Sequence, residues 1–263
     1  MLILAYIIMV GLTSGLITGL VGLGGGVIIV SAMIFLFTKL GFSHQHIMHL
    51  STATSLAAMI FTGSIAVWSH HKRKTINLPL LKIFVPGTMS GAFFGVVLAR
   101  DISSYWLSQF FACVTFLLAI YIILFTKEKS HRVNHPHLII MILLAFVTGV
   151  LAGLIGIGGG IILVPIFLWL GLSMKGAAVN SIICALPTVM TGAISAMIIG
   201  WNVKGLPPMT LGYVYWPAAL GVGVAALFTI PLGVHLAHRL PHLLIKRIFG
   251  ILLLLIAWRM LMM

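Results

Sequence analysis

The sequence predicts an all-α integral membrane protein made of two homologous halves. Three observations lead to this prediction: 61% of the 263 residues are hydrophobic, only 6% are charged, and long uncharged runs fill most of the chain. A soluble domain carries roughly 25% charged residues, so this chain cannot cover its surface for water. The first 38 residues contain no charged side chain, and a helix needs about 20 apolar residues to cross a bilayer. We therefore expect a multi-pass protein of the cell membrane, either a plasma or an inner membrane.

Each half is expected to contain an apolar helix, a break at three glycines, a shorter apolar helix and three full-length spans. The first repeat, residues 1–126, contains apolar segments at 2–21, 27–38, 47–68, 79–99 and 105–125. The second repeat, residues 138–263, contains them at 138–155, 161–170, 177–199, 213–237 and 243–262. A basic hinge at residues 127–137 joins the repeats, and its charge predicts a cytoplasmic location.

An internal sequence repeat is the clearest sign of duplication. Residues 15–30 read GLITGLVGLGGGVIIV, and residues 149–164 read GVLAGLIGIGGGIILV. Nine of the sixteen aligned positions are identical, and six of these are glycines. Since many membrane transporters are built from two related halves, the repeat indicates a transporter.

The relative orientation of the halves is predicted from the basic residues. If the first helix, the glycines and the short helix form a hairpin, each half crosses the membrane an odd number of times and the halves are inverted. Inverted halves put 11 Lys and Arg residues inside and 4 outside, whereas parallel halves put 9 inside and 6 outside. Because basic residues concentrate on the cytoplasmic side, we expect inverted repeats, each with a glycine-rich helical hairpin and three full spans.

The glycine triplets are the first candidates for a binding site. Three glycines inside a continuous helix cost about 1 kcal/mol each relative to alanine, so a break is expected there. Unwound backbone is tolerated at membrane depth only where protein groups or water in a cavity form hydrogen bonds with its N–H and C=O groups. The free amides and positive dipole end of the following helix suit an anion. The predicted substrate-binding residues of the triplets are Gly24, Gly25, Gly26, Gly158, Gly159 and Gly160.

The remaining glycines of the repeat have a different interpretation, because small residues allow helices to pack closely in a membrane. These residues are Gly15, Gly19, Gly22, Gly149, Gly153 and Gly156. On this interpretation, Gly15→Ala is expected to be milder than a bulky substitution in a triplet.

Hydroxyl and amide side chains on the third segment of each half are the second candidates. Uncharged donors suit a permeating anion, and Thr52 and Ser181 are the predicted substrate contacts among them. The alternative is that these groups bond to their own helix or to a neighbouring one. The whole set comprises Ser51, Thr52, Thr54, Ser55, Asn180, Ser181, Thr188 and Thr191.

The charge balance indicates the expected partners. Fifteen Lys and Arg residues against two carboxylates give a net charge of +13, which favours anionic solutes and lipid headgroups, although basic cytoplasmic loops alone also produce such a balance. We expect a small anionic substrate and the lipid bilayer as partners, no nucleic acid and no cofactor; the sequence indicates no oligomeric state.

Two other functional classes were considered. A divalent-metal transporter would use His44, His46 and His49, since imidazole binds transition metals, but no Asp, Glu or Cys joins that cluster. An enzyme is not expected, because no paired carboxylates, nucleophile with a base, or metal-binding helix motif occurs at membrane depth. Asp101 and Glu128 are predicted in loops, so transport should not require sodium, and any proton dependence should pass through histidine or the substrate's own ionisation.

The glycine motifs, with the Ser and Thr cluster after each, resemble the TauE/SafE family over essentially the whole chain. The motifs read Gly19-x-x-Gly22-x-Gly24-Gly25-Gly26 and Gly153-x-x-Gly156-x-Gly158-Gly159-Gly160. The resemblance implies a multi-pass plasma-membrane permease that generally exports small sulfur-containing anions, such as sulfite or organosulfonates. It also implies fewer spans than the ten apolar segments, which a re-entrant hairpin in each half would explain.

Overall fold

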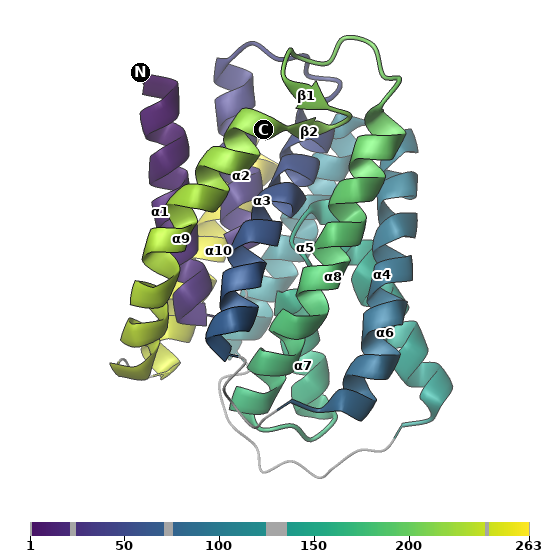
Figure 1. Cartoon of the computed structure of the whole chain (residues 1–263), viewed down its shortest axis with the longest axis vertical. Coiled ribbons are helices and arrows are strands. Elements are labelled where there is room, and N and C mark those ends of the chain that lie inside the picture. The colour runs from purple at the N-terminus through teal and green to yellow at the C-terminus, as the bar shows by residue number, and fades with distance from the viewer. Residues whose placement is uncertain (1, 22–24, 71–75, 125–135, 240–241, 263) are drawn as a thin grey trace.

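The computed structural model describes residues 2–21, 25–70, 76–124, 136–239 and 242–262. These residues form ten α-helices and one short β-hairpin (Figure 1). The first half contains α1 (Leu2–Val21), α2 (Gly25–Lys39), α3 (Ile47–His70), α4 (Leu78–Asp101) and α5 (Ser104–Leu124). The second half contains α6 (Leu138–Ile155), α7 (Gly160–Trp169), α8 (Met174–Gly200), β1 (Thr210–Leu211), β2 (Val214–Tyr215), α9 (Trp216–Arg239) and α10 (His242–Leu261).

The predicted all-α membrane class and all ten apolar segments are confirmed. Every segment corresponds to one helix, and no helix end differs from its prediction by more than three residues. Within the described residues, seven helices are long and apolar enough to span a membrane: α1, α3, α4, α5, α6, α8 and α9. The glycine-motif helices α2 and α7 have 15 and 10 residues, so at 1.5 Å per residue they are shorter than the bilayer core of about 30 Å.

The two halves are interlocked through their first and fourth helices. Helix α1 packs along α9, and α6 packs along α4, so the first helix of each half contacts the fourth helix of the other half. A Cβ atom placed on Gly15 would lie 2.7 Å from the carbonyl oxygen of Ala226, and one on Gly149 would lie 2.2 Å from that of Thr88. These approaches leave no room for a side chain, as is typical of small-residue helix contacts in membranes.

The packing interpretation is therefore confirmed for Gly15, Gly19, Gly149 and Gly153, each of which faces backbone atoms of the partner helix. Gly22 lies outside the described residues. The milder effect expected for Gly15→Ala stays a prediction. A Cβ there would lie 2.4 Å from the Thr229 hydroxyl and 2.7 Å from the Cα of Ala226, so the alanine would displace atoms of α9.

Helices α3 and α8 form the centre of the bundle. They contact each other, and α3 has the largest buried share among the seven candidate spans. The hairpin of β1 and β2 covers the end of the bundle at which α3 begins and α8 ends (Figure 1). Two polar residues of these helices have structural roles: the Thr54 hydroxyl accepts the Tyr215 N–H at 3.0 Å, and the Thr188 hydroxyl donates to the Thr88 hydroxyl at 2.8 Å.

Gly149→Ala is expected to destabilise the folded protein by about 1–3 kcal/mol, because the new methyl group overpacks the contact with α4. Thermal unfolding in detergent measures this loss. Gly176→Ala is the control, since its Cβ would lie 3.3 Å from the Ser173 hydroxyl, its nearest neighbour. Both variants gain the same intrinsic helix propensity, so equal melting temperatures would contradict the packing role of Gly149.

Candidate functional site

The two glycine segments meet at the centre of the molecule. A Cβ atom placed on Gly26, the second residue of α2, would lie 3.0 Å from the Cα of Ile157, which follows α6. Helix α6 ends at Gly156 in a left-handed conformation with φ 72°, and Gly158 and Gly159 both have φ 75°. Glycine adopts this conformation without the steric cost that a Cβ imposes. The predicted helix break in the second half is therefore confirmed.

Ser55, in the middle of α3, joins the two segments. Its hydroxyl lies 3.0 Å from the carbonyl oxygen of Gly156 and 3.3 Å from that of Gly26. A hydroxyl has a single proton, so these two acceptors share it. The Gly156 carbonyl follows the end of α6, so Ser55 supplies the donor that this group needs in a dry interior. The Gly26 carbonyl lies in the first turn of α2, where the helix itself also supplies a donor.

The junction lies halfway along the central helices. A Cβ atom on Gly26 or on Gly158 would lie 2.7 Å from the side chain of Met59, the thirteenth of the 24 residues of α3. The Gly158 position also faces Val189, the sixteenth of the 27 residues of α8. The glycine segments are therefore close to the midpoint of both central helices.

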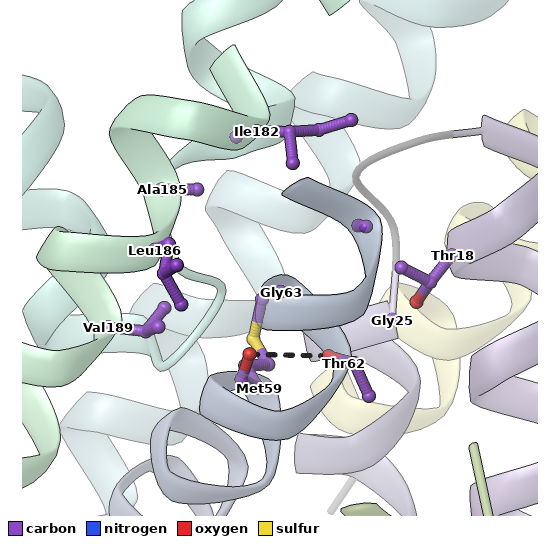
Figure 2. A pocket seen from close by; sticks show the side chains of 11 residues that line it. Thr18, Gly25, Met59, Thr62, Gly63, Ile182, Ala185, Leu186 and Val189 are labelled. Atoms are coloured by element: carbon purple, nitrogen blue, oxygen red, sulfur yellow. Dashed lines mark hydrogen bonds between the residues drawn. The ribbon is translucent and has the colours of Figure 1, made fainter. Parts of the chain in front are cut away.

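A small cavity lies beside this junction (Figure 2). The glycine-motif helices both begin at it, α2 with Gly25 and α7 with Gly160. Its volume of about 30 Å³ has room for roughly one or two water molecules. The other lining residues come from α1, α3 and α8: Thr18, Met59, Thr62, Gly63, Ala66, Ile182, Ala185, Leu186 and Val189.

Two threonine hydroxyls bring polarity to the cavity. The Thr18 hydroxyl donates to the Ser14 carbonyl at 2.7 Å, and the Thr62 hydroxyl donates to the Met59 carbonyl at 3.4 Å. A Cβ atom on Gly25 would lie 2.2 Å from the Thr18 hydroxyl oxygen. Since both protons are engaged within their own helices, each hydroxyl would have to rotate to donate to an anion.

The predicted site residues fall into three groups. Gly25 and Gly160 line the cavity, and Gly26, Gly158 and Gly159 lie at or next to the junction. Gly24 lies outside the described residues. Thr52 and Ser181 are buried, but their hydroxyls donate to their own helices, to the carbonyls of His49 at 3.1 Å and Ala178 at 2.8 Å.

Neither Thr52 nor Ser181 lines the cavity. In this conformation both hydroxyls bond to their own helices, as the alternative interpretation expected. Thr18 and Thr62 were not among the predicted residues, and Ser55 belonged to the wider set of hydroxyl candidates without being a predicted substrate contact. The repeat contains a signal for one of them, because Thr62-Gly63 matches Thr191-Gly192 in the second half. Thr18 aligns with Ala152, so comparing the halves gives no signal for it.

The histidine cluster lies at the hairpin end of the bundle. The rings of His46 and His49 are 6.3 Å apart, and His49 stacks on Tyr213 at 5.3 Å. Nε2 of His49 lies 2.8 Å from the Ala99 carbonyl oxygen, an acceptor, so this nitrogen carries the proton. Burial raises the pKa of Tyr213, although the charge of Arg100 lowers it in part. Among the described residues, no group of three or more His, Cys, Asp or Glu side chains could hold a metal ion.

The described part of the chain is a helical bundle with seven apolar candidate spans. Its two glycine segments meet near the midpoint of α3 and α8, beside a cavity to which both halves contribute. These features define a membrane transport protein. The family model described as sulfite exporter TauE/SafE matches residues 7–260. The chain therefore belongs to the TauE/SafE family, as its glycine motifs predicted.

Curated relatives are named as transporters. The chain is 30% identical to a probable membrane transporter protein of Haemophilus influenzae, and the match covers 96% of each chain. It is also 30% identical to the probable membrane transporter protein YunE of Bacillus subtilis, over 95% of this chain and 94% of that protein. A probable membrane transporter protein of Methanocaldococcus jannaschii is 28% identical, over 88% of this chain and 83% of the relative. These matches extend along nearly the whole molecule.

Ser55→Ala is expected to destabilise the protein by about 1–3 kcal/mol, because it leaves the buried Gly156 carbonyl without its donor and removes the link between the two glycine segments. Ser64→Ala is the matched control on the same helix: Ser64 is exposed, and its hydroxyl donates to the Ile60 carbonyl at 2.7 Å. Thermal unfolding of both variants in detergent measures the difference. If Ser55→Ala unfolds at the same temperature as Ser64→Ala, the proposed bridge contributes nothing to stability.

Proposed function

We propose that this protein exports small anions, specifically sulfite or organosulfonates, across the plasma or inner membrane. The observation that carries the proposal is that α2 and α7, the helices after the two glycine segments, begin at one shared cavity. The start of a helix carries a partial positive charge of about half a unit, together with amides that have no partner in the helix. Two such ends at one cavity favour an anion.

The electrostatics of the central helices support an anionic substrate. The two carboxylates of the sequence are Asp101, the last residue of α4, and Glu128 in the hinge, so neither belongs to a cavity-lining helix. An anion entering the cavity would therefore meet helix ends and hydroxyls without a carboxylate to repel it. The preference for sulfur-containing anions and the outward direction rest on the family's description as sulfite exporters.

The proposed substrate site contains both glycine triplets, with Thr18 and Thr62 at the cavity wall. A cavity of about 30 Å³ is too small for sulfite, so binding requires α3 and α8 to separate further. Separation at the junction would also bring Thr52 toward the cavity, because Thr52 packs directly against Gly156. Ser181 lies one residue before the cavity-lining Ile182. We keep it in the proposed site because separation of α3 and α8 would also widen the cavity on its side.

We further propose that the repeats, residues 1–126 and 138–263, are inverted about the hinge at 127–137. Near its start, α4 meets the early part of α8, where the Asn77 N–H donates to Asn180 Oδ1 at 2.9 Å. Its last turn meets the start of α3, where Ala99 accepts from His49. Since α3 and α8 hold the same place in the two repeats, their starts at opposite ends of α4 support inversion.

Reconstituted protein should transport sulfite or ethanesulfonate faster than it transports sulfate, zinc or manganese, and Gly25→Val should abolish the flux. The valine would occupy the position of the Thr18 hydroxyl and close the cavity. Gly159→Val should have the same effect, because a side chain at φ 75° is strained. His46→Ala is the control and should transport normally. Normal flux through both valine variants together with an inactive His46→Ala would instead favour metal transport.

Thr62→Val tests the cavity without changing its volume. Loss of the hydroxyl should lower the rate of anion flux roughly tenfold, since a hydrogen bond contributes about 1 kcal/mol or more. Thr38→Val is the matched control, because the Thr38 hydroxyl also bonds to its own helix, at the Ile34 carbonyl, but lies at the exposed end of α2. Equal fluxes in the two variants would remove Thr62 from the site.

Inverted repeats require residues 239 and 262 to lie on opposite sides of the membrane. Single cysteines replacing Arg239 and Met262, in a background without Cys113 and Cys184, should be labelled from the cytoplasm and from outside, respectively. A membrane-impermeant thiol reagent applied to intact cells and to inverted vesicles makes the distinction. Labelling of both positions from the same side would contradict inversion.

A further inference from the structure

An open groove lies on the outer surface of the bundle. It is formed by α1, α2 and α10 and has a volume of about 420 Å³, within the range of about 300–1,000 Å³ that is usual for ligand pockets. Most of its lining is aliphatic. The residues that matter most are Tyr6 from α1, Ala32 and Phe35 from α2, and Leu255 and Arg259 from α10.

Two cations meet over one aromatic ring at this groove. The guanidinium carbon of Arg259 lies 5.1 Å from the centre of the Phe35 ring, and the ammonium of Lys39 lies 5.9 Å from it. Both side chains are exposed. Neither of the two carboxylates in the sequence belongs to α1, α2 or α10. The helices of the groove therefore supply no carboxylate side chain to neutralise Arg259 and Lys39.

The floor of the groove is fixed by aromatic and hydrogen-bonding contacts. The Tyr6 hydroxyl donates to the Ala32 carbonyl at 3.1 Å and thereby ties α1 to α2. The rings of Tyr6 and Phe35 are 5.8 Å apart. The shape of the groove is therefore determined by three helices that hold each other, with the two cations at one end.

The position of the groove matches a membrane–water interface. Lys39 and Arg259 lie in the last turns of α2 and α10, and Trp258 beside Arg259 is 62% exposed, as in the aromatic belt of membrane proteins. From Arg259 the apolar lining continues along α10 to Leu252, a distance of roughly 10 Å for seven helical residues. The groove thus joins a cationic end to an apolar channel that faces lipid.

We propose that this groove binds one anionic phospholipid. Its phosphate binds Arg259, with Lys39 close to the same Phe35 ring, and one acyl chain lies along α10 toward Leu252. A guanidinium binds phosphate through paired, charge-assisted hydrogen bonds, and the nearby ammonium adds a second positive charge. Inverted repeats would leave only Lys39, Arg100, Lys204 and Arg259 on the outer side, so two of four outer basic residues meet at this groove.

Native mass spectrometry of the full chain in detergent tests the proposal. Purified protein is titrated with phosphatidylglycerol, with zwitterionic phosphatidylcholine and with inorganic phosphate. We expect one phosphatidylglycerol per chain, bound in preference to phosphatidylcholine and not displaced by millimolar phosphate. Arg259→Gln should weaken this binding about tenfold or more, which is the effect of losing a charge-assisted hydrogen bond.

Two further variants separate charge from shape. Arg247→Gln is the matched control, because Arg247 is an exposed arginine on the same helix, about three turns from Arg259, and does not line the groove; it should bind lipid as the wild type does. Ala32→Phe keeps the carbonyl that holds Tyr6 and both cations, but fills the apolar part, and should also lose the lipid.

Four results would overturn the proposal. The first is equal affinity for phosphatidylglycerol and phosphatidylcholine, and the second is equal weakening by Arg259→Gln and Arg247→Gln. The third is displacement of the lipid by phosphate alone, which would make the site one for a free anion. A lipid-free assembly of two chains would likewise assign the groove to a second copy of the protein. None of these measurements depends on transport, so the proposed function is tested separately.

Discussion

The contact between two interrupted helices at the centre of the bundle is the constraint on which the rest of the structure depends. A helix that stops inside a membrane exposes amide and carbonyl groups that lipid cannot satisfy. In this protein the start of α2 lies against the segment between α6 and α7, Gly26 against Ile157, and the Ser55 hydroxyl reaches a carbonyl of each. The protein supplies internally what water would supply elsewhere.

The exchange of helices between the halves keeps this contact in position. Each half gives its first helix to the fourth helix of the other, through glycines that bring the two backbones together. Neither half has a complete set of helix contacts alone, although the sequence divides cleanly at the hinge. The repeats are therefore units of sequence and ancestry, whereas the folded unit is the whole bundle.

The fold could be predicted from the sequence because membrane helices follow from apolar composition, and helix breaks follow from the free-energy cost of glycine inside a helix. Ten apolar segments became ten helices, and the triplet at 158–160 broke its helix because positive φ favours glycine. The hairpin was not predicted, since strands of two residues leave no alternating pattern. The close approach of Gly15 to Ala226 could not be predicted either, because sequence spacing gives no distance between helix backbones.

The candidate site was only partly predictable. The glycines of both triplets were identifiable from the repeat, but the orientation of each hydroxyl depends on how its helix is rotated. All four hydroxyls of Thr18, Thr52, Thr62 and Ser181 donate to their own helices, but only Thr18 and Thr62 line the cavity. Thr18 has no hydroxyl counterpart in the second half, where Ala152 stands. A comparison of two halves cannot detect a residue that only one of them has.

The single proton of Ser55 has a mechanical consequence. Its two acceptors, at 3.0 and 3.3 Å, belong to different halves. Ser55 and Gly26 belong to the same half, so when a small slide between the halves lengthens the bond to Gly156, the proton can turn to Gly26. The summed energy of the two Ser55 hydrogen bonds therefore changes less than the energy of the bond to Gly156 alone. A donor shared in this way links the two halves and still allows small movements between them.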